Sequence, residues 1–229
     1  MDTFHLADRE PVARAIEAAA KCDTLDELYA AIEAYKGHDV AAREPYTPAW
    51  PIKKPVAHPD GPLMIVSEKP EPGDLGADRP FTGRAYGSTM GEALVKCGVD
   101  VDQIHTTFAC HWAPGDEKSP NSTQLSASRP FLFREIEIVK PRAIMVQGRA
   151  VLESMLFYRD PITPWLGMTM GWKRGDLRIP LYITWHPAFA TRFKTQMGDF
   201  TEQVRGFFDQ FGMPDGGKVK QRPTYRMAA

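Results

Sequence analysis

The pattern of apolar and polar positions changes character along the chain. Between Thr24 and Gly37, apolar side chains recur three and four residues apart, as on the buried face of a helix. Thr24 and Glu27 form a capping-box pattern, and Gly37 is suited to follow the end of the helix. We therefore expect residues 1–50 to form a helical N-terminal extension that packs on the core. A proline-dotted connector follows at residues 45–62.

Beyond this connector, short apolar runs alternate with helical patterns. Unbroken apolar runs are typical of strands that are buried on both faces of a parallel sheet. The pattern predicts an α/β fold over residues 51–212, a three-layer α/β/α sandwich with a central four-stranded parallel sheet. We expect a Pro/Gly/Ser-rich loop to run to about Arg129. The expected strands are 63–66, 104–109, 142–146 and 181–184, and the expected helices are 88–96, 131–140, 149–157 and 197–211.

Composition places the chain among soluble globular proteins. Of its 229 residues, 43% are hydrophobic and 25% are charged, and no stretch reaches the roughly 18 apolar residues of a membrane helix. The first residues lack the features of a secretory signal, and the three cysteines form no C-x-x-C pair. We therefore expect a cytoplasmic protein without a disulfide framework or a membrane partner.

Charge is distributed unevenly along the chain. The net charge is −1, but residues 1–50 carry ten acids and five bases, so the remainder is mildly basic. Residues 213–229 contain four bases and one acid, and we expect them to form a basic, flexible tail. A basic body behind an acidic extension is compatible with contact to phosphates.

Common cofactor and metal motifs are absent from the sequence. No G-x-G-x-x-G follows a strand, and there is no G-x-x-x-x-G-K-[ST], which argues against dinucleotide and P-loop sites. His105, Cys110 and His111 fit no zinc spacing and lack a fourth ligand. We therefore expect neither a metal nor a cofactor.

Polar segments follow the predicted strands, where ligands bind in parallel sheets. They are SEKPEPGD and RPFTGRAYG after the first strand, ACHWAPG after the second, QG after the third and WHPAFATRF after the fourth. In order and spacing they resemble the uracil-DNA glycosylase superfamily, specifically its family-4-like branch. That branch carries GEAPG-x-x-E, G-x-PFVG, ITN…PPGN, KP-x-x-I-x-x-LG and HP-x-x-x-x-R, and the resemblance covers about residues 24–212.

The resemblance implies roles for individual residues. Asp74 matches a glutamate that helps to activate water, and Glu68 matches the second residue of GEAPG. His186 matches the histidine that binds the base carbonyl and stabilises the departing base, and Phe81 matches the aromatic on which the flipped base stacks. These residue types suit the reaction, because a carboxylate and a donor stabilise the charges that develop on sugar and base. The DNA-contacting positions implied are Gly83, Arg84, Pro114, Gly115 and Arg192.

Three departures from the family concern its cluster and its base-reading side. Most family-4 enzymes hold an iron–sulphur cluster with four cysteines, but here only Cys110 lies near such a position, so we expect no cluster. The asparagine that reads uracil is missing, and Thr106, Thr107 or even Phe108 aligns with it. Lys69 and Glu71 stand where the family has small residues, and Tyr86 is an apparent insertion. The expected base-binding residues are Phe81, Thr106, Thr107, Lys69 and Tyr86.

The resemblance and its departures together imply a DNA glycosylase with an altered substrate. We expect a monofunctional enzyme that flips out a modified pyrimidine from single- or double-stranded DNA and excises it hydrolytically, leaving an abasic site. A pyrimidine with a bulky polar 5-substituent would fit, such as glucosylated 5-hydroxymethylcytosine in phage DNA, which suggests antiviral defence. No obligatory protein partner is evident. The alternatives are uracil repair, an inactive DNA-binding module, and an unrelated α/β hydrolase, which the lack of G-x-S-x-G disfavours.

Overall fold

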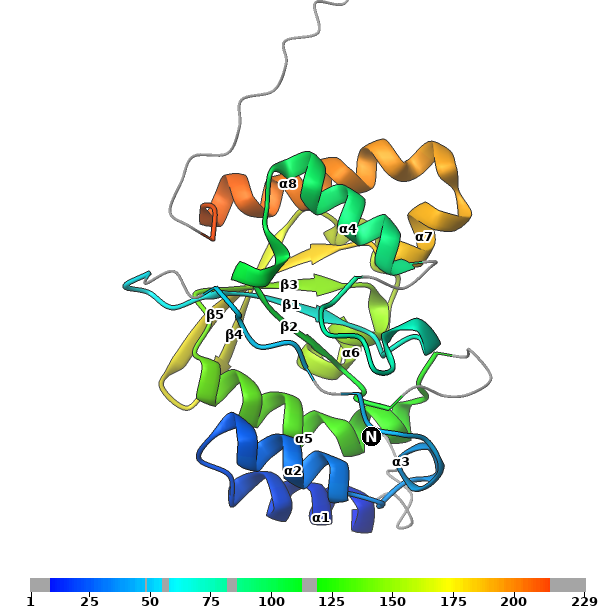
Figure 1. The fold of residues 1–229 in the computed structure, drawn as a ribbon, viewed down its shortest axis with the longest axis vertical. Coiled ribbons are helices and arrows are strands. Elements are labelled where there is room, and N and C mark those ends of the chain that lie inside the picture. Colours follow the sequence, from blue (N-terminus) through cyan, green and yellow to red (C-terminus); the bar gives the residue numbers. More distant parts are fainter. Residues whose placement is uncertain (1–8, 48, 55–57, 82–85, 113–118, 215–229) are drawn as a thin grey trace, which may run out of the picture.

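The computed structural model describes residues 9–47, 49–54, 58–81, 86–112 and 119–214. A five-stranded sheet of order β2-β1-β3-β5-β4 forms the centre of the molecule, between two layers of helices (Figure 1). The α/β/α sandwich predicted from the sequence is therefore confirmed. The strands are β1 (Leu63–Ser67), β2 (His105–Phe108), β3 (Ala143–Gln147), β4 (Thr169–Arg174) and β5 (Leu177–Thr184).

The four predicted strands are all present and run parallel to one another. The sheet also contains a fifth strand, β4, which the sequence pattern did not predict. Strand β4 pairs antiparallel with β5 at the sheet edge, with Trp172 opposite Ile179. Only Trp172 of β4 is buried, so the strand lacks the continuous apolar run that identified the others. An edge strand exposed to solvent gives a much weaker sequence signal than a central one.

Alternate residues of the central strands face two separate apolar clusters. Met64 and Val66 of β1 face the cluster formed with α5 (Ser122–Val139) and α6 (Arg149–Leu156). Leu63 and Ile65 face the cluster formed with α4 (Tyr86–Cys97) and α8 (Met197–Phe211). Burial on both faces explains why these strands read as unbroken apolar runs.

Helix α5 begins at Ser122, nine residues earlier than the sequence pattern predicted. The prediction that a loop extends to about Arg129 is therefore wrong. Asn121 caps the helix, accepting a hydrogen bond from the Gln124 amide at 2.9 Å, and the Gln124 side chain accepts from the Asn121 amide at 3.0 Å. This reciprocal cap starts the helix at Ser122, although serine is a weak helix former. The helix continues through Pro130.

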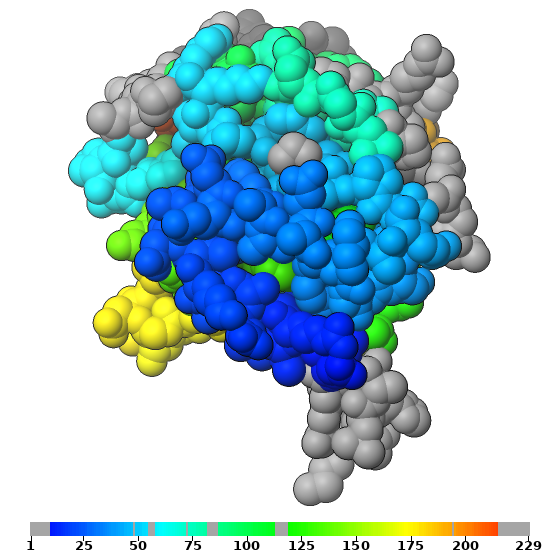
Figure 2. Space-filling model, turned by 60° about the horizontal axis from the view of Figure 1, so that its bottom comes forward, coloured from blue at the N-terminus to red at the C-terminus, as the bar shows by residue number. Residues whose placement is uncertain are grey.

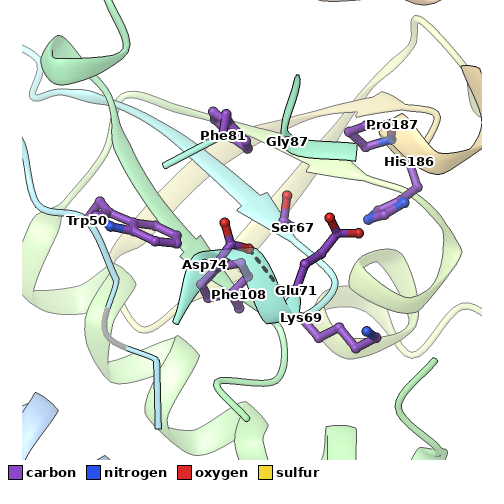
Figure 3. A pocket seen from close by; sticks show the side chains of 10 residues that line it. All are labelled: Trp50, Ser67, Lys69, Glu71, Asp74, Phe81, Gly87, Phe108, His186 and Pro187. Carbon is purple, nitrogen blue, oxygen red and sulfur yellow. Dashed lines mark hydrogen bonds between the residues drawn. The ribbon is translucent and has the colours of Figure 1, made fainter. Parts of the chain in front are cut away.

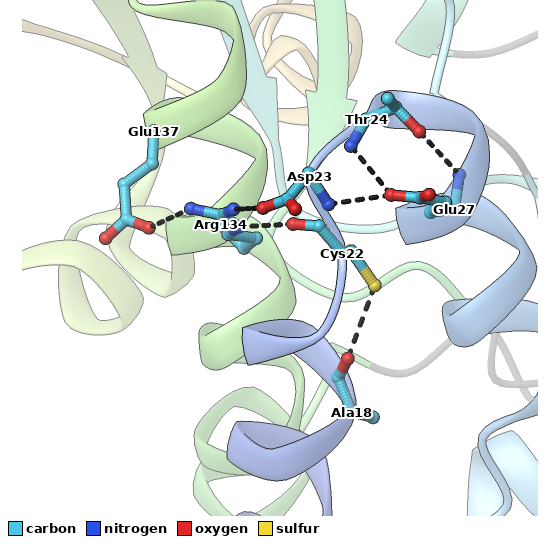
Figure 4. A network of polar contacts seen from close by, with 7 residues as sticks. All are labelled: Ala18, Cys22, Asp23, Thr24, Glu27, Arg134 and Glu137. Carbon is cyan, nitrogen blue, oxygen red and sulfur yellow. Dashed lines mark hydrogen bonds and ion pairs between the residues drawn. The ribbon is translucent and has the colours of Figure 1, made fainter.

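The N-terminal helices α1 (Arg9–Ala20), α2 (Leu25–Ala34) and α3 (Asp39–Arg43) lie outside α5 and cover one face of the molecule (Figures 1 and 2). Arg134 of α5 donates to the Cys22 carbonyl at 2.6 Å and to the Asp23 carboxylate at 2.8 Å (Figure 4). The predicted capping box of Thr24 and Glu27 is confirmed. These contacts fix the α1–α2 turn on α5.

The predicted role of Gly37 as a helix-terminating glycine is wrong. Helix α2 ends at Ala34, and Tyr35 takes an extended conformation that directs its ring towards Phe131. A Cβ at Gly37 would collide with the Tyr35 ring, so the glycine serves a close approach and does not supply a left-handed turn. No helix in the described part of the chain is long and apolar enough to cross a membrane.

Candidate active site

A pocket opens at the carboxyl ends of the parallel strands, where ligands bind in sheets of this type (Figure 3). It encloses about 340 Å³, including space open to solvent. The lining combines aromatic and ionisable side chains. The lining residues are Trp50, Ser67, Lys69, Glu71, Asp74, Phe81, Gly87, Phe108, His186 and Pro187.

Asp74 is held in the pocket by the short turn that follows β1. The 3₁₀ turn Pro72–Asp74 returns the chain so that the Asp74 carboxylate accepts a hydrogen bond from the Glu71 amide at 2.8 Å. Asp74 is 8% exposed, and this burial raises the pKa of its carboxyl, although the Glu71 amide and the Lys69 charge act in the opposite direction. A fixed carboxylate with a raised pKa is suited to accept a proton.

His186 follows β5 and caps helix α7 (Pro187–Arg192). Its Nδ1 accepts a hydrogen bond from the Ala188 amide at 3.2 Å, so the neutral ring carries its proton on Nε2. Burial lowers the pKa of His186, and the neighbouring Glu68 carboxylate opposes this shift. The residue therefore favours a neutral imidazole that acts as a donor through Nε2.

Three aromatic residues line the pocket, and sequence reasoning missed one of them. Trp50 lies in the proline-rich connector, which pairs with β2 through two backbone hydrogen bonds between Trp50 and Thr106. Its ring packs edge-on against Phe108 at 5.3 Å between centroids. Phe81 is half-buried and has a φ of 61°, in the left-handed region. Trp50 has no periodic apolar neighbours, so its size and its place beside Pro51 were the only signals in the sequence.

Ser67 is a further polar residue of the pocket lining. Its hydroxyl, at the end of β1, donates to the side-chain amide oxygen Oε1 of Gln147 at the end of β3. The Gln147 amide in turn points at the Met90 sulfur at 3.0 Å. This contact joins two adjacent strand ends and orients Ser67, which the sequence analysis did not single out.

The structure brings together four of the residues expected in the site. Lys69, Asp74, Phe81 and His186 all line the same pocket, together with Glu71, which was noted as a departure from the family. Glu68 is not among the lining residues, and its carboxylate influences His186 electrostatically.

Neither Thr106 nor Thr107, which were expected to read the base, is among the residues that line this pocket. The Thr107 hydroxyl donates to the buried Glu135 carboxylate at 2.7 Å, on the α5 side of the sheet, and His105 contacts the same carboxylate at 2.8 Å. Thr106 is fully buried beneath the connector. Phe108, the third alternative, is the β2 residue that reaches the pocket. Side chains alternate along a strand, so a one-residue shift in alignment changes the face that is assigned.

The expected DNA-contacting residues are only partly described. Arg192 is the last residue of α7, and its side chain is exposed. Tyr86 is the first residue of α4, and its side chain lies outside the described part of the structure. Gly83, Arg84, Pro114 and Gly115 lie outside the described residues.

The cysteines do not fit a four-thiolate cluster. Cys22 and Cys110 belong to the apolar cluster on one side of the sheet, and Cys97 belongs to the cluster on the other side. Burial raises the pKa of the Cys110 thiol to about 11, which disfavours the thiolate that iron–sulphur ligation needs. Among the described residues, no group of three or more His, Cys, Asp or Glu side chains is placed to hold a metal ion.

Aromatic packing joins the N-terminal extension to the core near Cys110. Tyr35 packs edge-on against Phe131 at 5.2 Å, and His38 packs edge-on against Trp112 at 5.0 Å. The His38 Nδ1 also accepts a hydrogen bond from the Ala41 amide at 3.1 Å. These contacts attach the extension to the segment after β2.

Comparison with known proteins identifies the family. The profile of the uracil DNA glycosylase superfamily matches residues 55–209, which include most of the pocket. The type-4 uracil-DNA glycosylase of Pyrobaculum aerophilum is 31% identical over 150 residues, covering 64% of this chain and 76% of that protein. The type-4 uracil-DNA glycosylase of Sulfurisphaera tokodaii is 28% identical over 138 residues, covering 58% and 62%. That of Thermotoga maritima is 28% identical over 131 residues, covering 57% and 66%. The chain therefore belongs to the uracil DNA glycosylase superfamily.

Proposed function

We propose that the protein is a DNA glycosylase that excises a pyrimidine with a bulky polar 5-substituent, such as glucosylated 5-hydroxymethylcytosine in phage DNA. Membership of the superfamily supports hydrolysis of an N-glycosyl bond in DNA. The observation that carries the substrate proposal is the pocket lining, which combines the aromatic side chains of Trp50 and Phe108 with the ionisable side chains of Lys69 and Glu71. Antiviral defence is the proposed biological role of this activity.

The catalytic residues we propose are Asp74 and His186. Water attacks the sugar C1′, and the electron pair of the glycosidic bond passes to the base. Asp74 orients this water and takes its proton, for which a raised carboxyl pKa is favourable. The His186 Nε2–H donates to the base oxygen on which negative charge develops. The base then takes up a proton from solvent, and an abasic site remains in the DNA.

Glu68 and Phe81 support these two residues. Glu68 does not line the pocket, but its negative charge favours a protonated nitrogen on the neighbouring His186 ring, which can then donate a hydrogen bond. Phe81 offers an aromatic surface to the flipped base, and stacking of this kind is worth about 1–3 kcal/mol per base. That gain offsets part of the cost of removing the base from the duplex, which is a few kcal/mol.

Four residues of the pocket lining are suited to contact a substituent on the base. The faces of Trp50 and Phe108 are suited to the apolar face of a sugar ring. Lys69 and Glu71 are suited to its hydroxyl groups, because hydrogen bonds to charged groups are worth about 1.5–3 kcal/mol each.

The second candidate function is uracil excision in repair. The type-4 uracil-DNA glycosylases matched by this chain favour it, and the pocket carries the aromatic, acidic and histidine groups that such a reaction uses. A catalytically inactive DNA-binding module is the third candidate.

Mass spectrometry of the bases released from DNA tests the proposal. The purified protein is incubated with matched DNAs that contain uracil, 5-hydroxymethylcytosine or its glucosylated form, with the Asp74→Asn variant as the control for release. Release of the glucosylated base well above uracil is the expected result. Release of uracil alone would assign repair, and DNA binding without release of any base would assign the binding module. To test the biological role, the protein is expressed in a bacterial host that is then infected with phages. We expect it to protect the host only against phages whose DNA carries the substituted base.

A further inference from the structure

A row of three aromatic side chains extends from the pocket along helix α7. Phe189 lies within α7, Trp185 precedes the first residue of the helix by two positions, and Phe193 directly follows its last residue. The ring centroids of Trp185 and Phe189 are 4.5 Å apart, and those of Phe189 and Phe193 are 5.0 Å apart. Phe189 is 37% exposed and Phe193 is 47% exposed. We call these three residues the α7 aromatic row.

The α7 aromatic row is continuous with the proposed catalytic pocket. Helix α7 begins directly after His186, and His186 and Pro187 both line the pocket. The Thr191 hydroxyl of α7 forms a hydrogen bond with the Thr89 hydroxyl of α4 at 2.7 Å, and Figure 1 shows α7 beside α4 at the end of the sheet. The row is therefore fixed relative to the pocket.

Positive charge accompanies the exposed rings. Arg192 is exposed at the end of α7, directly before Phe193. Exposed aromatic rings next to cations are the combination with which proteins bind single-stranded nucleic acid, because the rings stack on bases and the cations contact phosphates. Intact double-stranded DNA does not expose base faces on which these rings could stack, because its bases are stacked on one another.

We propose that the α7 aromatic row binds the unpaired bases next to the flipped nucleotide, so that the enzyme favours single-stranded DNA. This inference rests on the proposed DNA glycosylase function. The rings of the row are too close together for a base to insert between them. Bases therefore stack on the exposed surfaces of Phe189 and Phe193, while Trp185 supports the row from its half-buried position.

Binding of an unmodified, fluorescently labelled 15-nucleotide strand and of its duplex, followed by anisotropy, tests this proposal. The Phe193→Ala and Phe189→Ala variants should each raise the Kd for the single strand by roughly 5- to 100-fold, as expected for a lost stacking contact, and change the duplex Kd by less than about twofold. Phe193→Leu should behave like the alanine variant, and Phe193→Trp should retain binding. Phe157→Ala removes another exposed ring, beside Arg129 in a different hollow, and should change neither Kd.

Three results would overturn the proposal: unchanged single-strand binding in the Phe189 and Phe193 variants, equal losses on both forms of DNA, or full binding by Phe193→Leu. Loss of self-association in these variants with unchanged DNA binding would also overturn it and would assign the row to contacts between copies of the chain. Because the DNA is unmodified, these measurements do not depend on the excised base. Base release by the wild-type protein, measured separately by mass spectrometry, shows whether the proposed function itself fails.

Discussion

Gly148 at the end of β3 lies against His186 at the end of β5. A Cβ added to Gly148 would be 2.9 Å from the Cβ of His186, closer than real side chains approach. Gly148 has a φ of +88°, and its amide donates to the Thr184 carbonyl at 3.0 Å. The absence of a side chain therefore lets the two strand ends meet and leaves His186 the position from which it lines the pocket.

Replacing Gly148 with alanine should disturb His186 directly. The new methyl group cannot be accommodated without moving His186, and a misplacement of about 1 Å at a catalytic group can cost about 100-fold in rate. We expect Gly148→Ala to lower kcat for base release by at least about tenfold, measured with the substrate that the wild-type protein processes.

Gly212 provides a matched control for the Gly148 variant. Its φ of +76° and ψ of 165° are close to the +88° and 175° of Gly148, but nothing lies within 4 Å of an added Cβ. Gly212→Ala should therefore carry a comparable backbone strain, lower the thermal midpoint, and leave kcat unchanged. Equal losses of kcat in the two variants would contradict a specific contact between Gly148 and His186.

Local sequence patterns predicted the parts of the fold that depend on burial and capping. The apolar runs identified all four parallel strands, because each is buried on both faces. Residues that follow those strands, such as Asp74 and His186, could be assigned to one pocket because parallel strands end at one edge of the sheet. The exposed strand β4 and the first half of α5 lacked such signals.

The base-facing side of the pocket was less predictable, because it depends on register and on distant pairing. Whether Thr107 or Phe108 faces the pocket is decided by a one-residue difference along β2. Trp50 enters the pocket only because the connector pairs with Thr106 of β2, more than 50 residues further along the chain. Neither relationship leaves a local pattern in the sequence.

Replacing Asp74 with asparagine should abolish most base release while retaining DNA binding. Loss of a general base costs about 10²–10⁴ in rate. Because burial raises the Asp74 pKa, activity of the wild-type protein should fall with decreasing pH at values above the ordinary aspartate pKa of 3.8. The measurements are kcat/KM against pH for the wild-type protein and single-turnover release at neutral pH for the variant. Release at the wild-type rate by Asp74→Asn would exclude this role.

The same variant makes a separate prediction for stability. A buried carboxyl with a raised pKa favours the protonated form, so its contribution to stability is present at low pH and decreases as pH rises through the folded-state pKa. Asp74→Asn removes the free-energy cost of burying a charged carboxylate and keeps an acceptor for the Glu71 amide. We expect the variant to be at least as stable as the wild-type protein at neutral pH, by urea unfolding. A large destabilisation would indicate that lost packing causes the loss of activity.

Replacing Trp50 with alanine should affect a substituted base more than uracil. The indole is proposed to contact the substituent, and loss of one apolar contact in a pocket is worth about 1–3 kcal/mol, or 10- to 200-fold in kcat/KM. Trp50→Phe keeps an aromatic ring against Phe108 and should retain most of the activity. The measurement is the ratio of kcat/KM for the glucosylated base to that for uracil. An equal loss on both bases would assign Trp50 to packing of the connector.

His38 should make the fold sensitive to acid. Its ring is 7% exposed, caps α3 and packs on Trp112, and burial lowers its pKa to about 4 from the ordinary 6.5. A histidine with a lowered pKa contributes stability above pH 6.5, and this stability is lost as pH falls from 6.5 through 4 because the unfolded chain takes up the proton first. The shift corresponds to about 3 kcal/mol. His38→Asn keeps a capping side chain that does not titrate, so wild-type protein should lose about 3 kcal/mol more unfolding free energy than the variant over this range. Urea unfolding at pH 7, 5.5 and 4 measures this difference, and parallel curves for the two proteins would show that His38 does not link the N-terminal extension to pH.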